Sequence, residues 1–211
     1  MTVWTISAQM GTGGDRIAAE LAASAGVPLL DRQTLARFAH ELNPDDLDIE
    51  DIEEVEERFG GRLRMLALSM GMTTSSVAAA ALPEIQLRQK LPELGRAVFN
   101  EVARQPCVIL SPAAFTVLSE HPGAVHVRLH APPEVRIAAY QREQLVDRGH
   151  AEKALSHDDH IKGDLVRSLY HVKIDDDRRY ALVLDTSRFS PERLIEILLA
   201  AGGRWERTPA T

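Results

Sequence analysis

Apolar residues in this chain gather into short runs, which are separated by stretches with helical spacing. Residues 2–7 alternate β-branched and aromatic side chains, as a strand does, and residues 15–25 then repeat apolar side chains on one helical face. Between these two segments lies a glycine-rich stretch, residues 9–14. The pattern predicts a strand, a glycine turn and a helix in that order.

Further apolar runs of strand length follow, and each is preceded or followed by helical periodicity. Such alternation predicts an α/β fold with a five-stranded, mostly parallel sheet that helices cover on both faces. The last helix is expected to begin at Ser190 and Pro191, which suit a cap and a first turn, and to stop at Gly202-Gly203 after about Ala201. The further runs are residues 28–30, 107–110, 125–129 and 180–184.

Two long segments interrupt the alternation of strands and helices. Residues 43–105 contain no clear strand and are expected to form a helical insertion, and residues 151–178 are expected to form a lid-like region. Such helical excursions from a sheet are typical of a substrate-binding region and a mobile lid. We expect one domain over residues 1–203 and a frayed tail over residues 204–211.

The net charge of −7 is concentrated in one place. Nine of the thirteen residues 45–57 are acidic, and removing those nine leaves 22 acids against 24 lysines and arginines. A nucleotide-sized anion is therefore admissible, whereas a nucleic acid polymer would require a basic stripe that the chain lacks. Apolar residues recur at helical spacing within 45–57, which favours a helix with a solvated acidic face; a surface for a homodimer or another partner is the alternative.

No stretch approaches the roughly 20 apolar residues that a membrane span requires, and the first residues lack the features of a signal peptide. We therefore expect a cytoplasmic protein without a membrane partner. The single cysteine, Cys107, lies in an apolar run and is expected to be a buried, small hydrophobic residue. A disulfide framework and a multi-cysteine zinc site are excluded.

The glycine turn is the strongest candidate for chemistry. A phosphate group needs converging N–H donors, and glycines supply them without side chains in the way. A full Walker A motif would also bring a lysine and a magnesium-binding hydroxyl. Here Gly14 stands in the lysine position, Asp15 in the Ser/Thr position, and Arg16 just beyond. Nucleotide binding and a purely structural turn both remain open on the pattern alone.

Several motifs, in order along nearly the whole chain, resemble those of the cytidylate kinase-like family. That family typically shows I-S-R-Q-x-G-S-G-G followed by G-x-P-x-x-D-R. The resemblance implies a P-loop nucleotide kinase that uses ATP and Mg²⁺ to phosphorylate a small nucleotide, and it assigns no magnesium ligand. The matching segments are residues 6–18, 26–32, 127–132 with Arg136, and 180–188; the implied nucleotide-binding residues are Gly11, Thr12, Gly13, Gly14, Asp15 and Arg16.

The resemblance also implies an acceptor site and a closing lid. Residues 158–162 fall where the family has an Asp-x-x-Arg signature, so Lys162 would be the mobile cation that acts on the transferred phosphate. Arg16 is a second candidate cation in the first turn of the helix. For Arg16 and Arg37, an exposed position on a helix face is the alternative. The implied acceptor-binding residues are Asp31, Arg37 and Arg136, the lid residues are Asp159, Lys162 and Arg167, and the catalytic residues are Lys162 and Arg16.

Two departures from the family pattern bear on catalysis. The family arginine before the glutamine is Ala8 here, and its Gly-Arg-Gly after the third strand is replaced by Ser111-Pro112-Ala113. Phosphoryl transfer depends on positioning and charge neutralisation, so lost cations must be replaced. A kinase is therefore the first hypothesis, and a nucleotide-binding or interaction protein with weakened catalysis on the same fold is the second.

Overall fold

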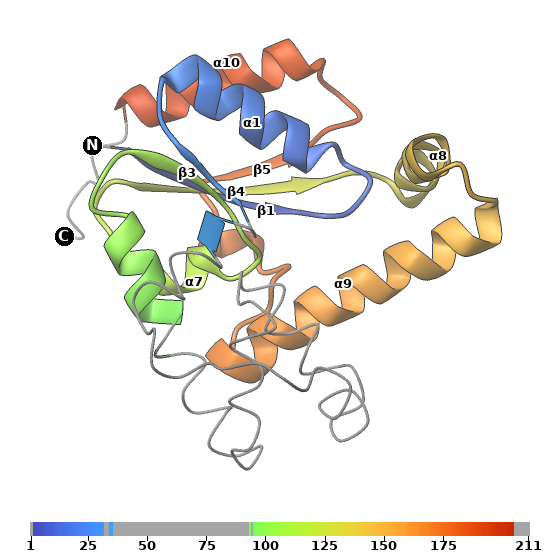
Figure 1. Ribbon diagram of the computed structural model, residues 1–211, viewed down its shortest axis with the longest axis horizontal. Helices are drawn as coiled ribbons and strands as arrows, with labels where there is room; N and C mark the ends of the chain where they lie inside the picture. Colours follow the sequence, from blue (N-terminus) through green and yellow to red (C-terminus); the bar gives the residue numbers. More distant parts are fainter. Residues whose placement is uncertain (1, 32–33, 36–92, 94, 205–211) are drawn as a thin grey trace.

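The computed structural model describes residues 2–31, 34–35, 93 and 95–204, and within them a sheet forms the centre of the molecule (Figure 1). The sheet has five strands in the order β2-β3-β1-β4-β5, and all neighbouring strands pair in parallel. This confirms the predicted parallel α/β sheet. The strands are β1 (Val3–Ala8), β2 (Leu29–Leu30), β3 (Cys107–Leu110), β4 (Ala124–His130) and β5 (Leu182–Asp185).

Helices cover both faces of the sheet. Helices α1 and α10 lie together on one face, and α7 lies on the other face, toward which α9 also runs (Figure 1). Residues 95–102 are helical too. The labelled helices are α1 (Gly14–Ala25), α7 (Ala114–Val117), α8 (Pro133–Gln144), α9 (Arg148–Tyr170), the 3₁₀ helix η3 (Asp177–Arg179) and α10 (Pro191–Arg204).

Neighbouring residues of β1 bury their side chains in different clusters, because successive side chains of a strand point to opposite faces. Val3 packs with Cys107 and Phe99 in one cluster, whereas Trp4 packs with Leu21 of α1 and Leu198 of α10 in the other. The sheet is thus buried on both sides, as the continuous apolar runs indicated.

Helix α10 corrects one prediction from the sequence. The expected stop at Gly202-Gly203 is wrong, because α10 continues through both glycines to Arg204. Close packing requires glycine at position 202, because a Cβ atom there would lie 2.1 Å from Cζ2 of Trp4. The Trp4 indole also donates a hydrogen bond to the Leu198 carbonyl at 3.0 Å, so the helix lies directly on the ring.

A hairpin of α8 and α9 carries the lid-like segment. Leu145, at the turn, adopts a left-handed conformation with φ of 55°. Asp147 then caps α9 by accepting a hydrogen bond from the His150 amide at 2.9 Å. Ile137 and Leu155 pack in one small cluster with Met10 of the glycine turn. The hairpin therefore holds α9 against that turn.

Several expectations fall on residues that the structure does not describe. The acidic run 45–57, most of the expected insertion and Arg37 all lie outside the described residues. Among the described helices, none is long and apolar enough to cross a membrane.

Candidate functional site

The glycine turn joins the end of β1 to the start of α1. Gly11 and Gly13 have positive φ angles of 82° and 73°, which glycine adopts without strain. Gly13 is the N-cap of α1, and no side chain caps the helix. Thr12 closes the turn, since its hydroxyl donates to the Gln9 carbonyl at 2.6 Å. The first N–H groups of α1 are thus left for an anion, and the helix dipole favours negative charge there.

Close packing explains why the turn has no lysine. A Cβ atom at Gly14 would lie 2.3 Å from the Cβ of Ala8, so no side chain fits at that position in this backbone. A Cβ at Gly11 would meet the Arg136 carbonyl at 2.7 Å. Glycine at these two positions is a steric requirement, and any cation for the loop must come from another element.

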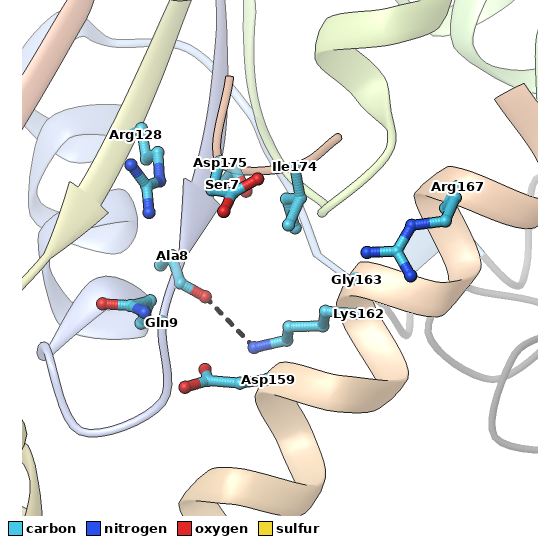
Figure 2. Close-up of a pocket in the computed structure, with 10 residues that line it drawn as sticks. All are labelled: Ser7, Ala8, Gln9, Arg128, Asp159, Lys162, Gly163, Arg167, Ile174 and Asp175. Atoms are coloured by element: carbon cyan, nitrogen blue, oxygen red, sulfur yellow. Dashed lines mark hydrogen bonds between the residues drawn. The ribbon is translucent and has the colours of Figure 1, made fainter. Parts of the chain in front are cut away.

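Lys162 of α9 supplies an ammonium group at the mouth of the loop. Its Nζ donates to the carbonyl oxygen of Ala8 at 3.1 Å, as the dashed line in Figure 2 shows. The same Nζ lies 2.8 Å from Oδ2 of Asp158. That oxygen is buried and accepts no hydrogen bond from the described residues, so the contact is an ion pair without hydrogen-bond geometry. Lys162, for which the resemblance implied the role of a mobile cation, therefore lies beside the loop.

Arg136 ties the loop to α9. The residue is only 5% exposed. Its Nε donates to the Met10 carbonyl at 2.8 Å, and its two amino groups donate to the two oxygens of Asp159 at 2.8 and 2.9 Å. Such a bidentate pair fixes geometry as well as charge. The guanidinium that the resemblance assigned to the acceptor is thus occupied by protein groups in this structure.

A cavity of about 710 Å³ opens in front of the loop. Asp15, Arg16 and Lys162 line it together with the glycines, and Asp31 and Ser111 line it from the ends of β2 and β3. In parallel α/β sheets, ligands bind at these carboxyl ends of the strands. The structure therefore brings Asp31, Lys162 and every predicted loop residue except Thr12 to one cavity.

The predicted residues differ in how they are engaged. Arg16 is 64% exposed in its side chain, and its Nε lies 3.8 Å from Glu20. Asp31 accepts hydrogen bonds from the Thr34 amide and hydroxyl at 2.9 and 2.8 Å. Asp31 thus caps the next helical residues while it faces the cavity.

A second, smaller cavity of about 230 Å³ lies behind Lys162 and is shown in Figure 2. Ala8, Gln9 and Lys162 line both cavities, whereas Arg128 and Arg167 line only the smaller one. The predicted lid residue Arg167 is thereby separated from the glycines of the loop.

The wall of this smaller cavity includes the chain that leads to β5. The Tyr180 hydroxyl donates to the carbonyl of the wall residue Ile174 at 2.8 Å. Burial raises the pKa of Tyr180 above its usual value. The phenol therefore stays neutral and keeps its donor on the Ile174 carbonyl.

Arg128 and Tyr140 line the cavities but are not among the site residues predicted from the sequence. Tyr140 lies within helical periodicity that carries no signal of its own. Arg128 interrupts the apolar run that forms β4, and a charged residue in a strand buried on both faces requires a partner or a ligand. That interruption was the available signal.

Comparisons with known proteins agree with this geometry. A family model described as the cytidylate kinase-like family matches residues 3–188. No curated protein matches the chain.

Solved structures match over nearly the whole chain at low sequence identity. An uncharacterised protein from Eubacterium ventriosum has a TM-score of 0.69 and 13% identity, with 96% of this chain and 99% of that chain covered. A shikimate kinase from Bacteroides thetaiotaomicron has a TM-score of 0.51, 15% identity, and coverage of 96% and 99%. A gluconokinase from Sinorhizobium meliloti has a TM-score of 0.50, 14% identity, and coverage of 96% and 92%. These similarities show a P-loop kinase fold.

Proposed function

Since this chain belongs to the cytidylate kinase-like family, we propose that it is an ATP-dependent kinase that phosphorylates a small acceptor of the nucleoside monophosphate class. The observation that carries the proposal is the position of Lys162. Its ammonium group lies 3.1 Å from the Ala8 carbonyl, at the mouth of a loop whose own lysine position has no room for a side chain. The lid helix thus provides the cation that the loop cannot carry.

Each element of the site has a distinct task in this proposal. The uncapped N–H groups at the start of α1 bind the phosphates. Lys162 then leaves the Ala8 carbonyl and donates to the phosphoryl group in transfer, where an added positive charge stabilises the transition state. Asp158, 2.8 Å from Nζ, keeps the ammonium directed toward the loop. Arg136 and Asp159 hold α9 in the position from which Lys162 acts.

The loop residues fit the phosphate groups of a nucleotide, and Asp15 fits a magnesium ion. Asp15 stands in the Ser/Thr position of the Walker pattern and lines the cavity, and its side chain has no hydrogen bond or ion pair among the described residues. Oxygen ligands of this kind suit Mg²⁺. When bound, ATP would supply the γ-phosphoryl group and Mg²⁺ would neutralise part of its charge.

The acceptor is assigned to the other end of the large cavity. Asp31 and Ser111 reach it from β2 and β3, and Arg37 remains the predicted ligand of the acceptor phosphate. A hydroxyl-bearing metabolite is the alternative acceptor, because the solved structures of similar fold include a shikimate kinase and a gluconokinase.

A nucleotide-binding protein with weakened catalysis is the second candidate function. The observation that favours it is the ion pair of Lys162, because Asp158 neutralises the cation that the loop needs. Ala8 and Pro112 stand where the family pattern has cationic or flexible residues. This candidate predicts nucleotide binding without product.

Two measurements on the same samples separate these candidates. The first is the shift in melting temperature with ATP and Mg²⁺, because a ligand that binds only the native state stabilises it. The second is product formation with a panel of nucleoside monophosphates, shikimate and gluconate. The proposed kinase requires both a shift and a product. A shift without any product supports the second candidate, and the absence of a shift contradicts both.

The role of Lys162 is tested by the variant Lys162→Met. We expect turnover to fall by at least 100-fold, with a much smaller change in the affinity for ATP, because the ammonium acts mainly on the transferred group. Lys153→Met is the matched control: Lys153 lies on the same helix but is exposed and distant from the loop cavity. Equal turnover in the two variants would remove Lys162 from the mechanism.

A further inference from the structure

The smaller cavity behind Lys162 has an arginine on its sheet side. Arg128 projects from β4 toward the cavity, while Lys162 and Arg167 face it from α9 (Figure 2). The Arg128 side chain is only 17% exposed, although it lies on a strand whose neighbours Val127 and Leu129 are fully buried. Burying a guanidinium is costly unless its donors are used, so the donors of Arg128 require an account.

Most side-chain donors of the two arginines have no partner within the part of the chain that the structure describes. Arg128 has a single side-chain hydrogen bond, from one amino group to a carboxylate oxygen of Asp177. Its Nε and its second amino group have no partner among the described residues. Among the described residues, the Arg167 side chain has one ionic contact, at 3.6 Å from Asp164, and it is 65% exposed. The unused N–H groups of two planar forks thus border one cavity.

The charges around the cavity favour an anion. Arg128, Lys162 and Arg167 line it together with the carboxylates of Asp159 and Asp175. Both oxygens of Asp159 accept hydrogen bonds from Arg136, which lies outside the cavity lining and compensates that carboxylate. Asp158 compensates the charge of Lys162 as an ion pair at 2.8 Å, without hydrogen-bond geometry.

Two cations and one carboxylate remain on the cavity wall once these pairs are set aside. The remaining cations are Arg128 and Arg167, and the remaining carboxylate is Asp175. Asp177 and Asp164, which do not line the cavity, each contact one of the two arginines. Asp177 is 60% exposed in its side chain, so an entering anion can replace it at low cost.

We propose that the smaller cavity is a second anion subsite, which binds a phosphate or carboxylate group through the forked donors of Arg128 with support from Arg167. The carboxylate of Asp177 accepts a hydrogen bond from the Arg128 guanidinium, as an incoming oxyanion would. The carboxylate and the oxyanion therefore compete for the guanidinium. A volume of about 230 Å³ holds one such group and a small part of the molecule that carries it.

The subsite gives the acceptor a second point of attachment. Lys162 separates the two cavities and lines both, so an anion on Arg128 lies on the far side of the ammonium group from the phosphate loop. Assignment of this anion to the acceptor rests on the proposed kinase function, whereas the binding of an anion to Arg128 does not. The acceptor class is then a hydroxyl or phosphate compound that carries a further anionic group.

The test measures binding of inorganic phosphate and of succinate by calorimetry. Each anion is titrated into the protein alone and into protein saturated with Mg²⁺ and a non-hydrolysable ATP analogue, which fills the phosphate loop. Binding of either anion to the saturated protein is expected. Phosphate alone would identify a phosphate group as the natural ligand, and succinate alone would identify a carboxylate. Absence of binding to the saturated protein would overturn the proposal, even if phosphate binds to the protein alone, because that binding would then be at the phosphate loop.

Two variants with opposite effects distinguish a subsite from a structural contact. Arg128→Gln removes the forked donors, so we expect anion affinity to fall roughly tenfold or more. Asp177→Asn removes the competing carboxylate, so we expect anion affinity to rise several-fold. If the Arg128–Asp177 contact serves only stability, both variants should lower the melting temperature, and they should not change the anion affinity in opposite directions. That outcome contradicts the proposal.

Controls keep the result interpretable. Arg193→Gln removes an exposed arginine on α10, and its anion affinity is expected to equal that of the unmodified protein. If Arg128→Gln does not fold, Arg128→Lys keeps the charge and loses the fork, and an unchanged affinity in that variant refutes a bidentate site. Failure of the ATP analogue to bind would contradict the proposed kinase function but not the anion subsite. In that case the opposite effects of the Arg128 and Asp177 variants on anion affinity are measured on the protein without nucleotide.

Discussion

The pair of Arg136 and Asp159 offers a quantitative test of how the loop is held. In the variant Asp159→Asn, the guanidinium keeps its bond to the Met10 carbonyl but loses the charge of its second partner. The amide can accept at one position only, and its own NH₂ group then faces one of the arginine donors. The variant therefore leaves a buried cation without its counter-charge.

The expected cost follows from burial. Breaking a fully buried ion pair costs about 3–5 kcal/mol, whereas an exposed pair contributes about 0–1 kcal/mol. The Arg136 side chain is 6% exposed, but that of Asp159 is 37% exposed, so water compensates part of the loss. We expect the free energy of unfolding to fall by about 2 kcal/mol. For a domain of this length, that loss corresponds to a decrease in melting temperature of roughly 4–8 °C.

Urea unfolding followed by circular dichroism measures this change, with Glu196→Gln as the matched control. Glu196 pairs with Arg193 on α10, and both side chains are more than 60% exposed, so this control should change the free energy of unfolding by less than about 1 kcal/mol. If Asp159→Asn costs no more than Glu196→Gln, the Arg136 pair does not anchor α9 to the loop.

Three further predictions follow from packing and burial. Gly202→Ala should lower the free energy of unfolding by about 1–3 kcal/mol, because the added Cβ would lie 2.1 Å from the Trp4 ring. A denaturant titration measures this change. Gly203→Ala is the control and should be neutral or stabilising, because a Cβ at position 203 meets nothing within 4 Å. Gly14→Ala should weaken binding of an ATP analogue by at least tenfold, because the added Cβ would lie 2.3 Å from the Cβ of Ala8. Adding Ala8→Gly to this variant removes the second Cβ and should restore much of the lost affinity. Equal affinities in the unmodified protein, the single variant and the double variant would contradict the steric account. Burial raises the pKa of Cys107 from 9.0 to about 11, so a thiol reagent at pH 8 should label only unfolded protein. Since the thiol ionises first in the unfolded chain, stability should also decline as pH rises from about 9 to 11, and rapid labelling of the native protein would contradict this burial.

Local patterns were sufficient to predict the strands of the sheet and the glycine turn between the first strand and the first helix. The run from Cys107 to Leu110 forms β3 with those same bounds, because a short apolar segment between polar ones has little alternative to a buried strand. Helix α1 begins at Gly14, one residue before the predicted helical segment 15–25, and ends at Ala25 as predicted. These features depend on residues close together in the sequence.

The remaining features depend on contacts between distant segments. The sequence predicted a helix end at Gly202 because glycine often follows the last residue of a helix. The contact that requires glycine there is with Trp4, almost 200 residues earlier, and the local sequence does not indicate it. The bond from Lys162 to Ala8 requires the α8–α9 hairpin to fold back onto the loop. The resemblance to the family implied a role for Arg136 at the acceptor, whereas its bidentate bond to Asp159 appears only in three dimensions.

A crystal structure with Mg²⁺ and a non-hydrolysable ATP analogue tests the central claim most directly. The account predicts the β- and γ-phosphates against the first N–H groups of α1, with Lys162 Nζ moved from the Ala8 carbonyl to within about 3 Å of a γ-phosphate oxygen. A triphosphate bound away from residues 11–16, or a Lys162 that remains on Ala8 and Asp158 without touching phosphate, would contradict it.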